Sequence, residues 1–364
     1  MIDQTGIALR DLEPRDAAPL VRLAEMATSA SWTEEFVLWK YFHNPIGNIT
    51  GTCADAEGSL VGFYGGVPVG IKLGDQRILG AQAADAMVSP KMRRRGLFSR
   101  MGHHTIHRLG QAGTHVIYAI ANPVSRVGSV KYLDFTYPGE IPTYVKILDP
   151  AAIAAATGLE GLSASFYRAL LRAVHLSRPP QSPPDEGIRV RELSAFDHRF
   201  DQLWADVSSD VDIAVVRDVP YLTWRYVENP LQRYLILAAE RGEALLGYTV
   251  LSFRDAEHKG VLAIAELLVR PSERSAGLAL LREASRRAAQ FGCGQLQCWM
   301  LPQYSFYTRL LQQSGFVHSP SRLLPGIFRQ TTSFITRLPE GATMTPDPTE
   351  LCNWFLTMGD QDYY

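Results

Sequence analysis

The sequence predicts an α+β fold built twice, as two tandem domains that each contain a mixed, mostly antiparallel sheet flanked by helices. The chain has 364 residues, a length that suits two domains of ordinary size. Motifs of the first half return in the second half at a nearly constant spacing. In each half, a strand and helices precede a meander of strands, and a further helix and strand follow.

The repeat is clearest where a strand meets a helix. Residues 84–98 contain a short apolar strand, a proline and an Arg-x-x-Gly sequence, and residues 265–279 repeat this order 181 positions later. The pattern Trp-Lys/Arg-Tyr-x-x-Asn-Pro also occurs twice, beginning at Trp39 and at Trp224, 185 positions apart. Nearly equal spacing over separate motifs indicates the internal duplication of one domain.

Apolar periodicity predicts the elements of the first half. Asp16 is expected to cap the first helix, and Asn44-Pro45 to end the second. The expected order is a strand at 7–12, a helix at 16–26, a second helix that closes at 39–41, strands at 49–54, 60–69 and 77–88, a helix at 97–109, a strand at 116–121, a short helix, and a last strand at 143–148 that completes the unit.

Shifts in composition predict the domain boundaries. Ser177–Pro184 contains four prolines, which is typical of a semi-rigid linker. The C-terminal residues are rich in aromatic side chains, which disordered tails lack, so we expect them to dock on the domains. The predicted division is an N-terminal domain at 1–150, a helical and proline-rich connector at 151–187, a C-terminal domain at 188–340 and a docking tail at 341–364.

Composition and charge exclude several classes of partner. A hydrophobic content of 46% is that of a globular chain, and a formal net charge of −1 offers no general attraction to nucleic acid or to a membrane surface. The N-terminal residues lack the features of a signal peptide, and no apolar run is long enough to span a membrane. The four cysteines have no C-x-x-C spacing. We therefore expect a cytoplasmic monomer or homodimer.

The first strand–helix junction has the features of a diphosphate site. An apolar strand ends at Val88, Pro90 stops it, and Gly96 is expected to open a helix. The amide groups at a helix N-terminus lack partners and carry partial positive charge, which favours phosphate. The cationic run Arg93–Arg95 adds donors for phosphate oxygens.

This junction resembles the acyl-CoA-binding signature of the GCN5-related N-acetyltransferases (the GNAT superfamily), R/Q-x-x-G-x-G/A, although Phe98 replaces its small last residue. The second copy, Arg274-x-x-Gly277-x-Ala279, matches at all three positions. The resemblance implies acetyl-CoA or another acyl-CoA as co-substrate, without a metal. The residues then expected to bind the cofactor are Met87, Val88, Arg93, Arg94, Arg95, Gly96, Leu97, Phe98, Arg274, Gly277 and Ala279.

Acyl transfer to an amine needs a proton acceptor and donors for the developing oxyanion. Asp85 and Glu266 take equivalent positions in the two copies, and a carboxylate within an apolar strand is expected to have a raised pKa. Either could act as the base, or could only point to solvent or pair with a lysine or arginine. Asn122 and Ser125 would face the cofactor or the acceptor, or would only cap a helix. The tyrosine that usually protonates the leaving thiolate in the family is absent, and Tyr307 is the nearest substitute in the second copy.

These features predict an acyl-CoA-dependent N-acyltransferase that acts on a primary amine of a small molecule. The Trp-Lys/Arg-Tyr-x-x-Asn-Pro repeats and the Thr357-Met-Gly-Asp360-x-Asp362 tail resemble tandem enzymes that acylate nucleotide-linked amino sugars. The first domain is the expected catalytic one because its junction is more basic and its Asn122/Ser125 segment is intact. Two alternatives remain: an aminoacyl transferase of the cell-wall type, and a non-catalytic CoA-binding sensor or scaffold. His103 and His107 lie one helical turn apart, but the sequence shows no third metal ligand beside them.

Overall fold

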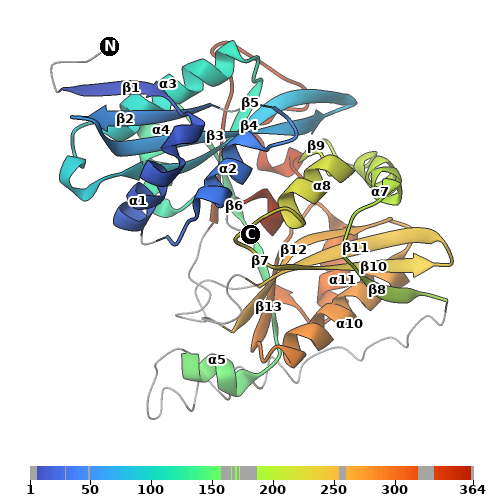
Figure 1. The fold of residues 1–364 in the computed structure, drawn as a ribbon. Coiled ribbons are helices and arrows are strands. Elements are labelled where there is room, and N and C mark those ends of the chain that lie inside the picture. Colours follow the sequence, from blue (N-terminus) through green and yellow to red (C-terminus); the bar gives the residue numbers. More distant parts are fainter. Residues whose placement is uncertain are drawn as a thin grey trace.

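The fold contains two sheets with helices on their faces, and the helices α2 and α8 lie between the sheets (Figure 1). The computed structural model describes residues 6–28, 30–47, 50–156, 187–253, 260–318 and 332–361, together with the single residues Ser165, Ala169 and Arg172. Most of the connector predicted at 151–187 lies outside the described residues. The α+β class and the doubled architecture are confirmed.

The first sheet has the order β1-β2-β3-β4-β5-β15-β6, and β9 also pairs with β3. Only β4 and β5 run parallel among the described pairs of this sheet. Its strands are β1 (Ile7–Asp11), β2 (Thr50–Ala56), β3 (Ser59–Leu73), β4 (Gln76–Val88), β5 (Val116–Ala121), β6 (Thr136–Ile141), β9 (Ile213–Val215) and β15 (Thr332–Arg337).

The second sheet has the order β14-β7-β13-β12-β11-β10-β8, and its described parallel pair is β12 with β13. The two sheets thus share one plan, in which a meander of antiparallel strands ends in a parallel pair. The strands of the second sheet are β7 (Thr143–Ile147), β8 (Arg189–Leu193), β10 (Tyr234–Arg241), β11 (Ala244–Ser252), β12 (Val261–Val269), β13 (Gln295–Trp299) and β14 (Val317–His318).

The two halves of the chain exchange a strand. β7, from the first half, lies between β13 and β14 of the second sheet, and β15, from the second half, lies between β5 and β6 of the first. The expectation that residues 143–148 complete the first unit is therefore wrong. Only Pro142 separates β6 from β7, which is too short for a hairpin, so the chain continues into the other sheet.

The helices agree closely with the apolar periodicity of the sequence. Asp16, however, does not cap the first long helix. It lies in a preceding turn of 3-10 helix, is buried, and accepts hydrogen bonds from Arg10 at 2.6 and 2.7 Å. The helices are α1 (Ala17–Thr28), α2 (Glu34–Phe42), α3 (Leu97–Gln111), α4 (Pro123–Tyr132), α5 (Pro150–Ala156), α7 (His198–Ser208), α8 (Val219–Tyr226), α10 (Arg274–Gln290) and α11 (Ser305–Gln313), with short 3-10 turns at Pro14–Asp16, Pro90–Met92, Leu351–Asn353 and Met358–Asp360.

Candidate active site

The junction between β4 and α3 is an open strand–turn–helix, as the sequence predicts. Gly96 is the N-cap of α3 with φ 70°, a left-handed conformation that glycine adopts without steric cost. A pocket of about 440 Å³ lies over this turn. It is lined by six of the predicted cofactor residues, Val88, Arg93, Arg94, Gly96, Leu97 and Phe98.

The charge at this junction suits an anion. Residues 90–100 contain five basic side chains and no acidic one. Arg94 and Arg95 are exposed in the turn, whereas Arg93 reaches back to donate to the backbone oxygen of Ala27 at 3.2 Å. The first-turn amides of α3 have no acceptor within the helix and point into the same region. Backbone donors and guanidinium groups are therefore concentrated where a diphosphate would lie.

The second junction differs from the prediction. Helix α10 begins at Arg274, so Gly277 lies inside the helix rather than at its start. Gly277 is buried, and a Cβ atom placed there would lie 2.6 Å from Leu310. The N-cap is Glu273, an acidic residue paired with Arg241 at 3.0 Å. Packing against α11 and an acidic cap therefore replace the open basic turn of the first copy.

A cleft opens where β4 and β5 separate. Their parallel pairing ends at Gln82 and Tyr118, and beyond it β4 forms a bulge in which Asp85 has φ 53°. The cleft has a volume of about 180 Å³ and joins residues that are far apart in the sequence. The predicted site residues that line it are Asp85, Met87, Phe98, Asn122 and Ser125.

Asp85 is held by two side chains of α2. Its Oδ2 accepts a hydrogen bond from Lys40 Nζ at 2.6 Å and a short one from the Tyr41 hydroxyl. The side chains of Lys40 and Asp85 are 4% and 1% exposed, so this is a buried ion pair. Such a pair stabilises the ionised carboxylate, and removing one partner would leave a buried charge without compensation.

Like Asp85, Glu266 contacts a tyrosine hydroxyl and a basic side chain, but its own side chain has no access to solvent. Tyr226 donates a hydrogen bond to its Oε1 at 2.9 Å, and Arg217 Nε lies 3.4 Å from its Oε2. Burial raises the pKa of Glu266, an effect that Arg217 opposes and Asp360 reinforces. The expected raised pKa is thus present in the second copy, at a carboxyl group that is fully enclosed by protein.

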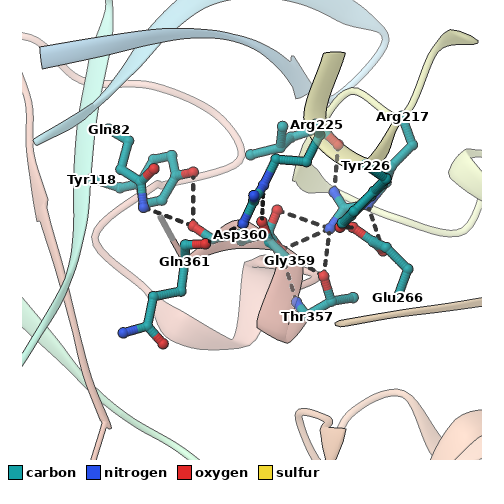
Figure 2. A network of polar contacts seen from close by, with 11 residues as sticks. Gln82, Tyr118, Arg217, Arg225, Tyr226, Glu266, Thr357, Gly359, Asp360 and Gln361 are labelled. Atoms are coloured by element: carbon teal, nitrogen blue, oxygen red, sulfur yellow. Dashed lines mark hydrogen bonds and ion pairs between the residues drawn. The ribbon is translucent and has the colours of Figure 1, made fainter. Parts of the chain in front are cut away.

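The C-terminal tail fills the space beside Glu266. Gly359 lies so close to β12 that a Cβ atom there would be 1.9 Å from the Tyr226 hydroxyl and 2.7 Å from a Glu266 carboxylate oxygen. The Asp360 carboxylate accepts hydrogen bonds from Arg217 at 2.7 and 2.9 Å (Figure 2). The second cleft is therefore occupied by the protein's own chain, through residues 357–360.

Tyr307 belongs to this filled cleft and lies apart from Asp85. Its hydroxyl donates to the backbone oxygen of Val269 at 3.1 Å and accepts from the backbone nitrogen of the same residue at 3.2 Å. Its ring contacts Phe355 of the tail. Burial raises the pKa of Tyr307, so the phenol stays neutral and bridges α11 to β12.

Asn122 and Ser125 lie at the start of α4, as expected for the capping alternative. The side chain of Asn122 caps α4 by accepting hydrogen bonds from the backbone nitrogens of Val124 at 3.0 Å and Ser125 at 2.9 Å. Both residues also line the open cleft. Capping therefore fixes two polar side chains at the edge of this cleft.

Three further residues of the cleft carry no signal in the sequence: Trp32, Tyr64 and Gln361. Trp32 precedes α2, Tyr64 lies on β3 beside the β4 bulge, and Gln361 comes from the tail. Burial raises the pKa of Tyr64, which keeps its phenol protonated. Only the tertiary fold brings these residues to Asp85, because none belongs to the repeated motifs.

Other kinds of site find no support among the described residues. No three His, Cys, Asp or Glu side chains in that part of the chain lie close enough to hold a metal ion, and His103 and His107 are exposed on α3. None of the described helices has both the length and the apolar character that a membrane-spanning helix requires.

Two family models match the sequence. Residues 9–132 match a model described as acetyltransferase (GNAT) domain, and residues 197–312 match one described as acetyltransferase (GNAT) family. Together the matches cover about two thirds of the chain. A search of curated proteins finds no match.

Solved structures share the fold at low sequence identity. A probable N-acyltransferase from Enterococcus faecalis has a TM-score of 0.61 at 11% identity, with 91% of this chain and 72% of that chain covered. A GCN5-related N-acetyltransferase from Kribbella flavida has a TM-score of 0.57 at 15% identity, with 91% and 71% covered. N-myristoyltransferase from Saccharomyces cerevisiae, solved with bound myristoyl-CoA, has a TM-score of 0.61 at 11% identity, with 92% and 83% covered.

The two sheets share a plan, each with one parallel pair, and a family match falls on each half of the chain. The chain therefore belongs to the GNAT superfamily and is an acyltransferase with two tandem GNAT domains.

Proposed function

We propose that the first domain transfers an acyl group from acyl-CoA to the primary amine of a small molecule, and that the second domain binds no cofactor. One observation carries this proposal: of the two equivalent clefts, the first is open and the second is filled by the C-terminal tail. The basic turn at Gly96 likewise has a pocket above it, whereas the equivalent turn starts a packed helix with an acidic cap.

In this proposal the diphosphate of the cofactor lies against the N-terminus of α3, and the acyl arm enters the cleft between β4 and β5. The amine nitrogen attacks the thioester carbonyl, the C–N bond forms, and the C–S bond breaks to release the thiolate. A backbone amide at the β4 bulge, next to Asp85 or Ala86, would stabilise the oxyanion.

Asp85 is the proposed acceptor of the amine proton. It is the one charged side chain among the described residues that line the cleft. Because its side chain is only 1% exposed, the proton would reach it through a water molecule. The thiolate would leave unassisted, since coenzyme A thiol is moderately acidic and no tyrosine stands at the family's usual position.

The lining of the cleft also favours the proposed class of acceptor, a nucleotide-linked amino sugar. Asn122, Ser125 and Gln361 offer neutral hydrogen-bonding groups, and Trp32 offers an aromatic surface. Neutral donors and acceptors suit the hydroxyl groups of the amino sugar itself, which is the part of the acceptor that would enter this cleft. The nucleotide link rests on the resemblance of the Trp-Lys/Arg-Tyr-x-x-Asn-Pro repeats and of the Thr357-Met-Gly-Asp360-x-Asp362 tail.

Two measurements test the proposal. Isothermal titration with acetyl-CoA should give one site per chain, and two sites would contradict the assignment of the second domain. Release of CoA thiol should depend on both acetyl-CoA and an amino sugar. Binding of CoA without transfer to any of a set of amino sugars would favour the alternative of a CoA-binding sensor.

A further inference from the structure

The C-terminal tail contacts both domains at the point where their clefts begin. The backbone oxygen of Asp360 accepts hydrogen bonds from Gln82 at 2.8 Å and from Tyr118 at 3.2 Å. These two residues are the last parallel pair of β4 and β5, so the tail lies at the closed end of the open cleft. Figure 2 shows this carbonyl group between the two side chains.

The position of the tail is fixed from the side of the second domain. Arg217, which is fully buried, binds the Asp360 carboxylate, and the same carboxylate accepts from the backbone nitrogen of Thr357 at 2.7 Å. Arg225 donates to the backbone oxygen of Gln361 at 2.6 Å. The main chain of Gln361 is therefore held on both sides, which leaves only its side chain to adjust.

The side chain of Gln361 reaches the open cleft. It extends away from the buried network of Arg217 and Asp360 in Figure 2 and lines the cleft that also contains Asp85 and Trp32. Within the described part of the chain, its amide group has no hydrogen-bond partner. A primary amide that is held in place and lines a cleft offers both a donor and an acceptor to a ligand.

We propose that Gln361 is a specificity-determining residue, whose amide binds a hydroxyl group of the acceptor amine in the cleft of the first domain. This inference rests on the proposed function. The second domain then contributes to the reaction through its filled cleft, because that cleft anchors the tail which carries Gln361. The substrate class is a primary amine that bears hydroxyl groups.

The test compares wild-type protein with Gln361→Met, which keeps the length of the side chain but removes the amide. Steady-state release of CoA thiol is measured with acetyl-CoA and two amines: glucosamine, which carries hydroxyl groups, and cyclohexylamine, which carries none. The control variant is Gln290→Met, because Gln290 is exposed at the end of α10 and away from the cleft.

We expect Gln361→Met to raise KM for glucosamine about three- to tenfold, the effect of one neutral hydrogen bond. Its kcat/KM for cyclohexylamine and its Kd for CoA should equal those of wild type and of Gln290→Met. An equal loss of kcat/KM with both amines, or no loss of kcat/KM with either, overturns the inference while leaving the proposed function intact. A wild-type protein that transfers the acetyl group neither to these amines nor to a nucleotide-linked amino sugar overturns both.

Discussion

The indole rings of Trp39 and Trp224 stack on each other, and each donates its Nε1 hydrogen to the backbone oxygen of the other residue. The ring centroids are 4.8 Å apart with an angle of 18° between the planes, and the two hydrogen bonds measure 2.9 and 3.1 Å. The residues hold the same place in the two copies of the repeat. The contact therefore joins α2 to α8 where the two domains meet with pseudo-twofold symmetry.

Replacing Trp39 with phenylalanine should destabilise the protein by about 1–3 kcal/mol, because the buried backbone oxygen of Trp224 loses its donor. Urea denaturation measures the change. The matched variants are Trp224→Phe and the double variant, which together form a thermodynamic cycle. If the two rings act as a pair, the effects will be non-additive by at least about 0.5 kcal/mol; simple additivity would argue against the pairing.

Gly96→Ala and Gly277→Ala should have opposite consequences. At Gly96 a Cβ atom meets nothing within 4 Å, so alanine would project into the space proposed for the diphosphate and weaken CoA binding, with added strain from φ 70°. At Gly277 the Cβ atom meets Leu310 at 2.6 Å, so alanine should lower the free energy of unfolding without changing the Kd for CoA. Titration calorimetry and urea denaturation separate the two; a loss of CoA binding in Gly277→Ala would show that the second copy holds cofactor.

Asp85→Asn should lower turnover at neutral pH far more than it changes the affinity for CoA, because the amine loses its proton acceptor. The same change leaves Lys40 buried without its carboxylate, which alone costs about 3–5 kcal/mol. The double variant Asp85→Asn with Lys40→Met removes both charges and should regain stability but not turnover. Unchanged turnover in Asp85→Asn would reject the proposed role, and recovery of turnover in the double variant would assign Asp85 a purely structural one.

The raised pKa of Glu266 predicts that the free energy of unfolding depends on pH. Because its pKa in the folded protein is raised above the ordinary value of 4.5, the folded state keeps a proton that the unfolded chain releases. The stabilisation that this retained proton provides is complete below pH 4.5. It is lost as the pH rises through the pKa that Glu266 has in the folded protein. The difference in unfolding free energy between wild type and Glu266→Gln should therefore fall with rising pH from 4.5 upward. A difference in unfolding free energy that grows above pH 4.5 would contradict the raised pKa of Glu266.

Gly359→Ala should displace the tail, since its new methyl group would overlap the Tyr226 hydroxyl. We expect a lower free energy of unfolding and faster cleavage of the C-terminal segment by protease, because docked segments resist cleavage. In the Gly359→Ala variant KM for the acceptor should also rise, whereas the Kd for CoA, which binds at the Gly96 turn, should not change. Gly341→Ala is not a matched control, because Gly341 has φ 72°. Thr343→Ala, at an exposed position of the same segment, serves instead.

Local patterns in the sequence were sufficient for the family and for many of the elements, but not for the strands β6, β9 and β15. The strand that ends at Val88, the helix that follows Gly96 and the repeat of the Trp39 motif at Trp224 all depend on neighbouring residues, whose periodicity and turn chemistry the sequence displays directly. The acidic position on the central strand and the arginines of the turn could be identified in the same way.

What the tertiary structure alone decided is which copy of the repeat has an open site. Gly277 matches the sequence signature better than the first copy does, yet packing against Leu310 places it inside a helix. The exchange of β7 and β15 joins segments that are distant along the chain, and so does the cleft that Gln361 and Asp85 both line. Such contacts follow from which surfaces the folded domains bury against each other, and no local pattern encodes that choice.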